Sequence, residues 1–320
     1  RSNCPARTLS PPRTIAPFNL QQAKIHQHDW AAYLGQNIEF IEPMTKMKFV
    51  LVPPGEAVLG APNIYRDIRR EKRQHKVWIS KPFYLGVFEV TQEQYQRLMI
   101  TNPSKWSVPD KGEFPVEKTT WYDARDFCQK LSSKSGKVFR LPTDAEWEYA
   151  CRAGSNTYYS FGQNPAELEK HAWFGNNSGK ESIDAYSFMK KRPDEYDSYL
   201  DGNFCRSHPV GTRKQNPWGL FDMHGNVWEW CHDNYTADYY GDSPKRNPQG
   251  PEESLDPDEP DILKRIQRGG SFMCSDTYCT GYRVTARMKG EEDSGLYHTG
   301  FRYVVSHDGL AAYGTTDGHR

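Results

Sequence analysis

The chain of 320 residues lacks any apolar run that approaches the roughly 20 residues needed for a membrane-spanning helix. It also lacks net charge, because 41 Lys and Arg residues balance 41 Asp and Glu residues. A clustered positive charge is the usual footprint of proteins that bind nucleic acid or anionic membranes. The two absences therefore predict a soluble chain with no membrane span and no nucleic-acid partner.

The cysteine pattern excludes two further classes of protein. Seven cysteines are an odd number, and all but one close pair are scattered, so a disulfide framework is not predicted. No C-x2-C motif or second close pair could complete the four ligands of a structural zinc site. No signal peptide is recognisable in the printed sequence, which begins with Arg1 rather than Met. A processed chain in an extracytoplasmic location is the expectation, with the compartment otherwise open.

Aromatic residues are abundant, and this excludes a disordered chain. The sequence has 9 Trp, 19 Tyr and 15 Phe, which disordered segments contain sparingly. A chain of this length can bury a substantial core. With 25 Gly and 22 Pro, and with no repeats or linker, it is typical of one loop-rich domain of mixed α+β class.

Local signals predict several helices. Thr91-x-x-Gln94 and Thr143-x-x-Glu146 are capping boxes, which mark helix starts. Between them, apolar residues at 124, 127, 128 and 131 follow the i, i+3, i+4, i+7 spacing of one buried helix face. The cysteines at 128 and 151 are therefore predicted core residues rather than ligands. A short helix is also predicted over residues 20–34, after an extended arm.

Other segments are predicted as strands or loops. Residues 47–59 contain two apolar runs around Pro-Pro-Gly and predict a hairpin, and residues 77–90 and 266 onward predict strands. The basic stretch 66–76, the polar stretch 164–205 and the acidic, proline-rich stretch 243–261 are predicted to be loops or irregular structure.

The segment Arg268 to Cys279, RGGSFMCSDTYC, is the most informative in the chain, because it contains the close pair Cys274 and Cys279. Five residues apart is about 140° around a helix and opposite faces of a strand, so the backbone must bend for both sulfurs to face one atom. Two thiolates in one bent segment suit a soft metal such as Cu(I) or a redox reaction. A local disulfide is the alternative left open.

This segment, followed by Gly300-Phe-Arg, resembles the C-terminal signature of the formylglycine-generating enzymes, the sulfatase-modifying factor family. Two upstream motifs, RLPTDAEWEY from Arg140 and GNVWEW from Gly225, resemble further signatures of the same family. The resemblance covers roughly residues 47–305 and implies a C-type-lectin-related α+β fold with little regular secondary structure. The domains expected are an arm with a short helix over 1–40, one family domain over 41–307 and a polar tail over 308–320.

The resemblance implies a copper-dependent oxidase. Cys274 and Cys279 match the copper-binding pair of catalytic members with unchanged spacing. There, a cysteine of a protein or peptide substrate, such as a sulfatase, supplies a third sulfur, and O2 converts that cysteine to formylglycine. Copper provides the one-electron and O2 chemistry that side chains lack. Ser271 matches a serine near the oxygen site, and a turn hydroxyl bonded to backbone is its alternative role.

The resemblance also implies a structural calcium ion. Asp222 and Glu229 offer carboxylates, and Gly225 and Val227 offer carbonyls, which together are the hard oxygen set that Ca2+ takes. From the residues alone, Glu229 could equally be a surface carboxylate or the partner of a buried arginine. A second calcium site is doubtful, because Trp173 stands where catalytic relatives carry an asparagine.

One departure lies near the expected chemistry. His298 stands where relatives carry an asparagine that holds substrate, so a substrate-binding role is expected for it. Tuning of substrate choice, proton transfer near neutral pH and simple packing beneath the Gly300 turn are the three hypotheses.

Two other functions remain as alternatives to formylglycine formation. A non-catalytic binding or scaffolding member would share the fold, and an oxidase could act on a different peptide side chain. An iron enzyme of the ergothioneine type would need an added helical domain with a His-rich motif, which this sequence does not contain.

Overall fold

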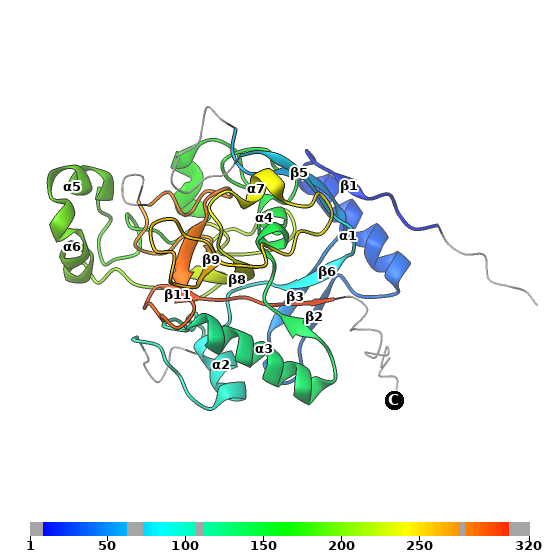
Figure 1. The fold of residues 1–320 in the computed structure, drawn as a ribbon, viewed down its shortest axis with the longest axis horizontal. Coiled ribbons are helices and arrows are strands. Elements are labelled where there is room, and N and C mark those ends of the chain that lie inside the picture. The colour runs from blue at the N-terminus through cyan, green and yellow to red at the C-terminus, as the bar shows by residue number, and fades with distance from the viewer. Residues whose placement is uncertain (1–8, 63–72, 107–111, 276–278, 307–320) are drawn as a thin grey trace, which may run out of the picture.

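A computed structural model describes residues 9–62, 73–106, 112–275 and 279–306 of the chain. The fold is α+β, with small sheets joined by long irregular segments (Figure 1). The predicted tail over 308–320 and most of the basic stretch 66–76 lie outside the described residues.

Three sheets organise the described residues. The five-stranded sheet has the order β2-β3-β6-β12-β7 and consists of Glu39–Ile41, Lys48–Val52, Phe83–Gly86, Val304–Ser306 and Phe139–Arg140. The four-stranded sheet has the order β10-β9-β8-β11 and consists of Met288–Glu291, Lys264–Arg268, Trp228–Asn234 and Thr299–Gly300. The three-stranded sheet has the order β1-β4-β5 and consists of Thr14–Ile15, Gly55–Leu59 and His75–Ile79.

The prediction of a hairpin over residues 47–59 is wrong, because its two strands are present but do not pair with each other. β3 pairs with β2 and β6, whereas β4 pairs with β1 and β5 in a different sheet. The Pro53-Pro54 step carries the chain from one sheet to the other. The Pro53 carbonyl accepts from the Tyr149 hydroxyl at 3.0 Å, and the Pro54 carbonyl accepts from the Thr14 N–H at 3.0 Å. Tertiary partners thus replace the local turn that the sequence suggested.

All four helices predicted from the sequence are present. Both predicted capping boxes are present, and they open α2 (Gln92–Met99) and α4 (Asp144–Arg152). α1 (Leu20–Leu34) and α3 (Trp121–Ser135) each start with a capping box of their own. Gly136 ends α3 in the left-handed conformation, and Ala153 takes the same conformation at the end of α4.

Two large apolar clusters lie on the five-stranded sheet. One joins that sheet to α1, α2 and α3 and contains Phe127, Cys128 and Phe301. The other joins it to α4 and the three-stranded sheet and contains Trp147, Cys151 and Trp218. The two cysteines are fully buried, which confirms the core role predicted for them.

The stretch 164–205 was expected to be irregular, but it contains short helices. These are the 3-10 helices η2 (Pro165–Lys170) and η3 (Pro193–Glu195) and the α-helices α5 (Ala185–Lys191) and α6 (Tyr196–Gly202). Figure 1 shows α5 and α6 projecting together from one end of the molecule. The remaining short helix, α7 (Tyr239–Asp242), lies near α4.

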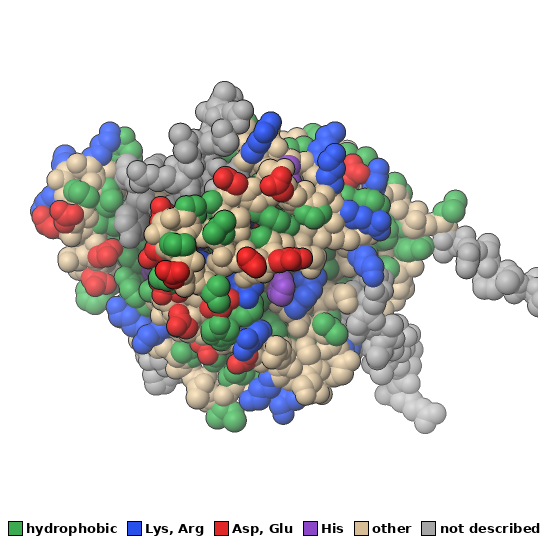
Figure 2. Space-filling view, viewed as in Figure 1, with side chains coloured by type: hydrophobic (Ala, Val, Ile, Leu, Met, Phe, Trp, Pro, Cys, Tyr) green, Lys and Arg blue, Asp and Glu red, His purple; other side chains and the backbone are tan. Residues whose placement is uncertain are grey.

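No helix among the described residues combines the length and apolar character needed to cross a bilayer. Acidic and basic side chains are interspersed over the face shown in Figure 2, including the lobe that α5 and α6 form. This distribution agrees with the balanced charge of the sequence.

Candidate functional site

The cysteine segment leaves the four-stranded sheet at the end of β9. Gly269 and Gly270 follow Arg268 with φ of +94° and +76°, a left-handed conformation that favours glycine. Gly270 also lies close to the backbone of a later part of the chain. A Cβ on Gly270 would lie 2.7 Å from the Tyr282 nitrogen and 2.8 Å from the Gly281 carbonyl carbon.

Gly270 and Gly281 therefore touch, and we call the segment between them, with its described residues 270–275 and 279–281, the cysteine loop. A Cβ on Gly281 would lie 3.0 Å from the Gly270 Cα and 2.4 Å from two ring atoms of Trp228 on β8. Two glycines and one fully buried tryptophan close the loop, and both cysteines lie within it.

The loop brings the two predicted ligands together. Cys274 and Cys279 form a disulfide with an S–S length of 2.06 Å and Cα atoms 5.1 Å apart. Both are almost fully buried, with exposed fractions of 1% and 5%. The bend required by the C-x4-C spacing is thus present, and the pair is in the disulfide form that the sequence left open.

Ser271 lies against the first cysteine. Its N–H donates to the Cys274 Sγ at 3.3 Å, and its hydroxyl lies 3.9 Å from the same sulfur. The hydroxyl also accepts from the Met273 N–H at 3.3 Å, which is the turn role considered for it. Ser271 makes both sets of contacts at once, so it is a neighbour of the cysteine pair as well as a turn residue.

Aromatic side chains surround the pair. The cysteines share a buried cluster with Trp228, Tyr282 and Tyr159. Beside it, His224 is held between the Tyr282 carbonyl and the Ser160 hydroxyl, both at 2.8 Å, and burial lowers its pKa to about 4. A neutral imidazole therefore packs beside this aromatic cluster.

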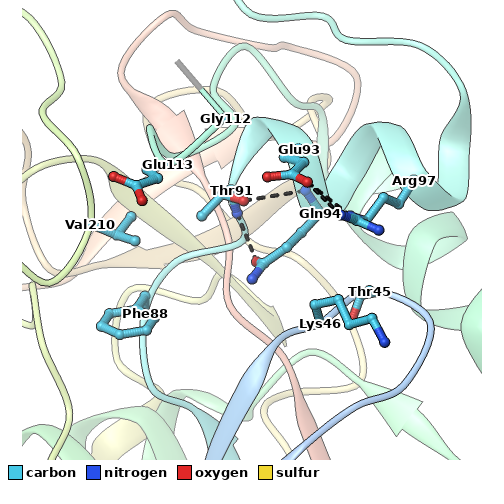
Figure 3. A pocket seen from close by; sticks show the side chains of 10 residues that line it. All are labelled: Thr45, Lys46, Phe88, Thr91, Glu93, Gln94, Arg97, Gly112, Glu113 and Val210. Carbon is cyan, nitrogen blue, oxygen red and sulfur yellow. Dashed lines mark hydrogen bonds and ion pairs between the residues drawn. The ribbon is translucent and has the colours of Figure 1, made fainter. Parts of the chain in front are cut away.

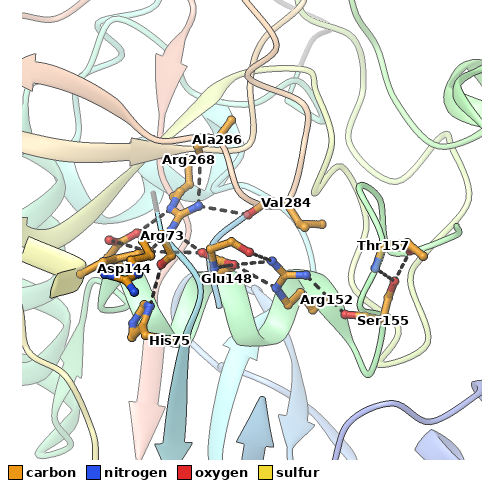
Figure 4. Close-up of polar contacts among 12 residues, drawn as sticks. Arg73, His75, Asp144, Glu148, Arg152, Ser155, Thr157, Arg268, Val284 and Ala286 are labelled. Carbon is orange, nitrogen blue, oxygen red and sulfur yellow. Dashed lines mark hydrogen bonds and ion pairs between the residues drawn. The ribbon is translucent and has the colours of Figure 1, made fainter. Parts of the chain in front are cut away.

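A buried ionic network anchors the start of the cysteine segment. The Arg268 guanidinium donates to Asp144 at 2.5 Å and to Glu148 at 2.8 Å, as Figure 4 shows. It also donates to the carbonyls of Val284 and Ala286, each at 3.0 Å. One fully buried arginine thus ties the residues before the loop to those after it and to helix α4.

Glu229 of the predicted calcium set is the partner of a buried arginine. The Arg302 Nε and one terminal nitrogen donate to its two oxygens at 2.6 and 2.7 Å. The Trp147 Nε1–H donates to it at 2.6 Å, and all three side chains are fully buried. Of the two alternatives weighed for Glu229 from the residues alone, the pairing with a buried arginine is present and the surface position is not.

Asp222 offers an open oxygen. One of its carboxylate oxygens accepts from the Gly211 N–H at 2.7 Å, and the other is buried with no hydrogen-bond partner in the described part of the chain. Burial raises the pKa of Asp222 to about 6. Burial and the nearby Asp222 raise the pKa of Glu89 well above its usual value.

The two carboxylates of the calcium donor set differ, because Glu229 is paired with Arg302 whereas Asp222 keeps one oxygen without a partner in the described part of the chain. Gly225 packs with its Cα against the Trp173 carbonyl, and Val227 is fully buried. Within residues 9–62, 73–106, 112–275 and 279–306, no group of three or more His, Cys, Asp or Glu side chains is arranged to hold a metal ion. Calcium binding by Asp222, Gly225, Val227 and Glu229 stays a prediction.

His298 adjoins the same region. Its carbonyl accepts from the Trp228 N–H at 2.8 Å, and Tyr297 beside it packs near Phe272 of the cysteine segment, with ring centroids 6.2 Å apart. Its Nδ1 is buried without a hydrogen-bond partner among the described residues, and burial lowers its pKa to about 4. Burial therefore opposes the titration near neutral pH that was expected from the ordinary imidazole, and a role for His298 in proton transfer stays a prediction.

A cleft of about 360 Å3 lies elsewhere, against helix α2. Figure 3 shows charged side chains on its walls, with Glu93 and Arg97 paired and Lys46 and Glu113 on other sides. None of its lining residues was predicted as a site residue, so this cleft is not the site built around the cysteines.

Comparison with known proteins identifies the family. Residues 38–307 match the family model of the sulfatase-modifying factor enzyme 1-like domain. The chain belongs to this family. The formylglycine-generating enzyme of Mus musculus is 31% identical, in a match that covers 83% of this chain and 77% of the mouse protein.

Bacterial members of the sulfatase-modifying factor family match over shorter stretches. The formylglycine-generating enzyme of Thermomonospora curvata is 34% identical over 199 residues, or 61% of this chain and 57% of the relative. That of Streptomyces coelicolor is 35% identical over 189 residues, or 59% of this chain and 51% of the relative. The matches therefore span little more than half the length of these two relatives.

Solved structures share the fold. Treponema denticola variable protein 1 has a TM-score of 0.66 and 27% identity, covering 85% of this chain and all of that one. PvdO from Pseudomonas aeruginosa has a TM-score of 0.64 and 22% identity, covering 84% and 97%. The predicted fold class is confirmed.

The sequence did not reveal every residue that shapes the site. Gly281 and Trp228 close the loop, and Tyr196 of α6 reaches it from the stretch expected to be irregular. The i, i+4 spacing of Tyr196 and Leu200, both buried, is a helical signal that could have indicated the packing of α6.

Proposed function

We propose that this protein oxidises a cysteine of a protein or peptide substrate, of the sulfatase type, to formylglycine, using O2 and copper. The observation that carries the proposal is the closed loop that places Cys274 and Cys279 side by side, in a chain with several relatives named formylglycine-generating enzyme. Ser271 adjoins the pair, as the resemblance requires.

The donor set fits Cu(I). Two soft sulfurs from one loop are close enough to bond to each other, so their reduced forms could both face one ion. Cys274 and Cys279 would hold the ion, which when bound supplies one-electron and O2 chemistry. Since the disulfide engages both sulfurs, reduction of the pair must precede metal binding.

The protein's own residues provide the setting for this chemistry. The Ser271 N–H donates to the Cys274 sulfur at 3.3 Å and so helps to fix the position of that sulfur. The aromatic cluster around the pair excludes water from it. His298 beside Trp228 is the proposed substrate-binding residue, acting as a neutral group.

The overall reaction fixes what must be supplied. The substrate CH2–SH group becomes an aldehyde, its sulfur leaves as hydrogen sulfide, and O2 provides the aldehyde oxygen and one molecule of water. That balance requires two further electrons and two protons, for which an external thiol is the reductant we propose.

We also propose a structural Ca2+ near Asp222, where a buried carboxylate oxygen has no partner in the described residues. A ligand that binds only the folded state stabilises it. Added Ca2+ should therefore raise the melting temperature relative to chelator, and Asp222→Asn should remove the difference. Equal melting temperatures with Ca2+ and with chelator would refute this part of the proposal.

Titration of the reduced protein with Cu(I) against a competing chelator tests the copper site. One tightly bound ion per chain is expected, and either Cys274→Ser or Cys279→Ser should abolish tight binding. Cys128→Ser is the matched control, because that thiol is buried in the core away from the loop. Equal affinity in the wild type and both site variants would refute the copper site and favour a disulfide-stapled scaffold.

A further inference from the structure

Three consecutive backbone carbonyls of the cysteine segment accept hydrogen bonds from the stretch 164–205. The Phe272 carbonyl accepts from the Ser178 hydroxyl at 2.8 Å. The Met273 carbonyl accepts from the Tyr196 hydroxyl at 3.0 Å. The Cys274 carbonyl accepts from the Gly175 N–H at 2.8 Å.

We refer to Gly175, Ser178 and Tyr196 as the clasp. They come from two separate parts of the stretch, since Gly175 and Ser178 follow η2 and Tyr196 begins α6. Ser178 and Tyr196 are each 1% exposed, so their hydroxyls make these bonds away from bulk water. Buried hydrogen bonds of this kind are costly to lose, because the carbonyl left behind has no water to replace its partner.

The clasp is closely fitted. A Cβ on Gly175 would lie 2.6 Å from the Tyr196 hydroxyl and 2.9 Å from the Cys274 carbonyl oxygen. Only glycine therefore lets the backbone at 175 come near enough to bond the Cys274 carbonyl while Tyr196 bonds the Met273 carbonyl. Around these contacts, Tyr196, Leu200, Phe272 and Met273 form one buried apolar cluster.

The backbone N–H groups of the same segment make their hydrogen bonds within the cysteine loop. The N–H groups of Met273 and Cys274 bond to Ser271, and the Ser271 N–H bonds to the Cys274 sulfur. The clasp thus holds the carbonyl groups of residues 272–274, while the N–H groups of the same turn bond to Ser271 beside the Cys274 sulfur. Figure 1 shows that the elements supplying Tyr196 form the projecting α5–α6 lobe, which the two main apolar cores do not include.

We infer that Tyr196 and its clasp partners are positioning residues for Cys274, and that the α5–α6 lobe serves to hold the cysteine loop in its binding conformation. The consequence for copper rests on the proposed function, whereas the consequence for the cysteine pair does not. Thiols held in place lose less freedom when they bond to each other or to one ion, so both processes become more favourable.

The test compares Tyr196→Phe with Tyr199→Phe, a matched control. Both tyrosines lie on α6, but the Tyr199 ring stacks on Phe188 at 3.8 Å and does not contact the cysteine segment through any hydrogen bond identified in the described residues. A second pair of variants is Gly175→Ala, which inserts a methyl group into the clasp, and Gly202→Ala, whose added Cβ would meet nothing within 4 Å.

The measurement is the equilibrium between dithiol and disulfide forms of Cys274 and Cys279 in thiol buffers, read by mass spectrometry after alkylation. Tyr196→Phe should disfavour the disulfide about five-fold, the effect of one neutral hydrogen bond. Gly175→Ala should exceed that effect, and the two controls should match the wild type. Cu(I) affinity should fall by a similar factor in the same variants.

A purely structural role predicts a different pattern. Melting temperatures of Tyr196→Phe and Gly175→Ala would fall while the pair's equilibrium stayed at the wild-type value, and that result would overturn the inference. If wild-type protein binds no Cu(I), the proposed function fails, but the dithiol equilibrium of the four variants still decides whether the clasp positions Cys274.

Discussion

Replacement of Glu229 by Gln is expected to destabilise the protein strongly, even with calcium removed. The substitution keeps the size of the side chain but removes the charge opposite Arg302, whose guanidinium is fully buried. The remaining donors of Arg302 bond to the carbonyls of Gly86, Val87 and Phe221. Those carbonyls satisfy hydrogen bonds but do not neutralise the charge.

The magnitude follows from this geometry. Removal of one partner from a buried ion pair costs about 3–5 kcal/mol, and the carboxyl groups of Glu89 and Asp222, which also interact with Arg302, place the expected loss at the lower end of that range. Glu93→Gln is the matched control, because Glu93 also pairs with an arginine, Arg97, but the two side chains are 55% and 45% exposed. An exposed pair contributes about 0–1 kcal/mol, so the control should change stability little.

Urea unfolding in the presence of a calcium chelator gives the free energy of unfolding of each variant. A second variant, Glu229→Gln combined with Arg302→Met, removes the buried charge and should recover much of the loss. If Glu229→Gln were as stable as the wild type in chelator and lost stability only against calcium-loaded wild type, the assignment of Glu229 to Arg302 would be refuted. The carboxylate would then act chiefly through calcium.

Three other perturbations have defined outcomes. Gly281→Ala places a Cβ 2.4 Å from the Trp228 ring, so the loop must open by about 1 Å, at a cost of about 1–3 kcal/mol in chemical unfolding; an equal stability to Gly241→Ala, whose Cβ meets nothing within 4 Å, would contradict the loop closure. Burial raises the pKa of Asp233 from 3.8 to about 8, so its contribution to the free energy of unfolding is present below pH 4 and lost as the pH rises to 8. Asp233→Asn should flatten this pH dependence of the free energy of unfolding, measured in urea titrations at pH 5, 7 and 9. The same pH dependence in the wild type and the variant would contradict the role given to Asp233. His298→Asn should improve turnover of a peptide with the Cys-x-Pro-x-Arg pattern, which the family resemblance implies as the sulfatase motif. The shape of the rate profile from pH 6 to 9 should not change, because burial lowers the imidazole pKa to about 4. A titration near neutral pH that is present in the wild type and absent from the variant would contradict this prediction.

Local signals in the sequence predicted the elements whose structure is decided locally. The capping boxes at Thr91 and Thr143 are present because a side chain three residues away completes each cap. The bend between Cys274 and Cys279 was predictable because no regular element allows that spacing. These features depend on neighbouring residues, which a sequence displays directly.

Features decided by distant partners were not predictable in the same way. The strands on either side of Pro53 join different sheets, because β3 pairs with β2 and β6 whereas β4 pairs with β1 and β5. The choice of Arg302 as partner of Glu229 depends on packing across 73 residues, and burial of His298 depends on the sheet beside it. The clasp from 164–205 escaped prediction because its polar composition resembles that of an ordinary surface loop.

The most direct test of the proposed function is aldehyde formation on a peptide that contains a single Cys-x-Pro-x-Arg motif. Reduced protein loaded with Cu(I) is incubated with the peptide, O2 and an external thiol, and the product is trapped with an aldehyde-reactive probe and analysed by mass spectrometry. The account predicts trapped aldehyde at the substrate cysteine with wild-type protein and none with Cys279→Ser. Absence of aldehyde from folded wild-type protein that holds one copper ion per chain would contradict it.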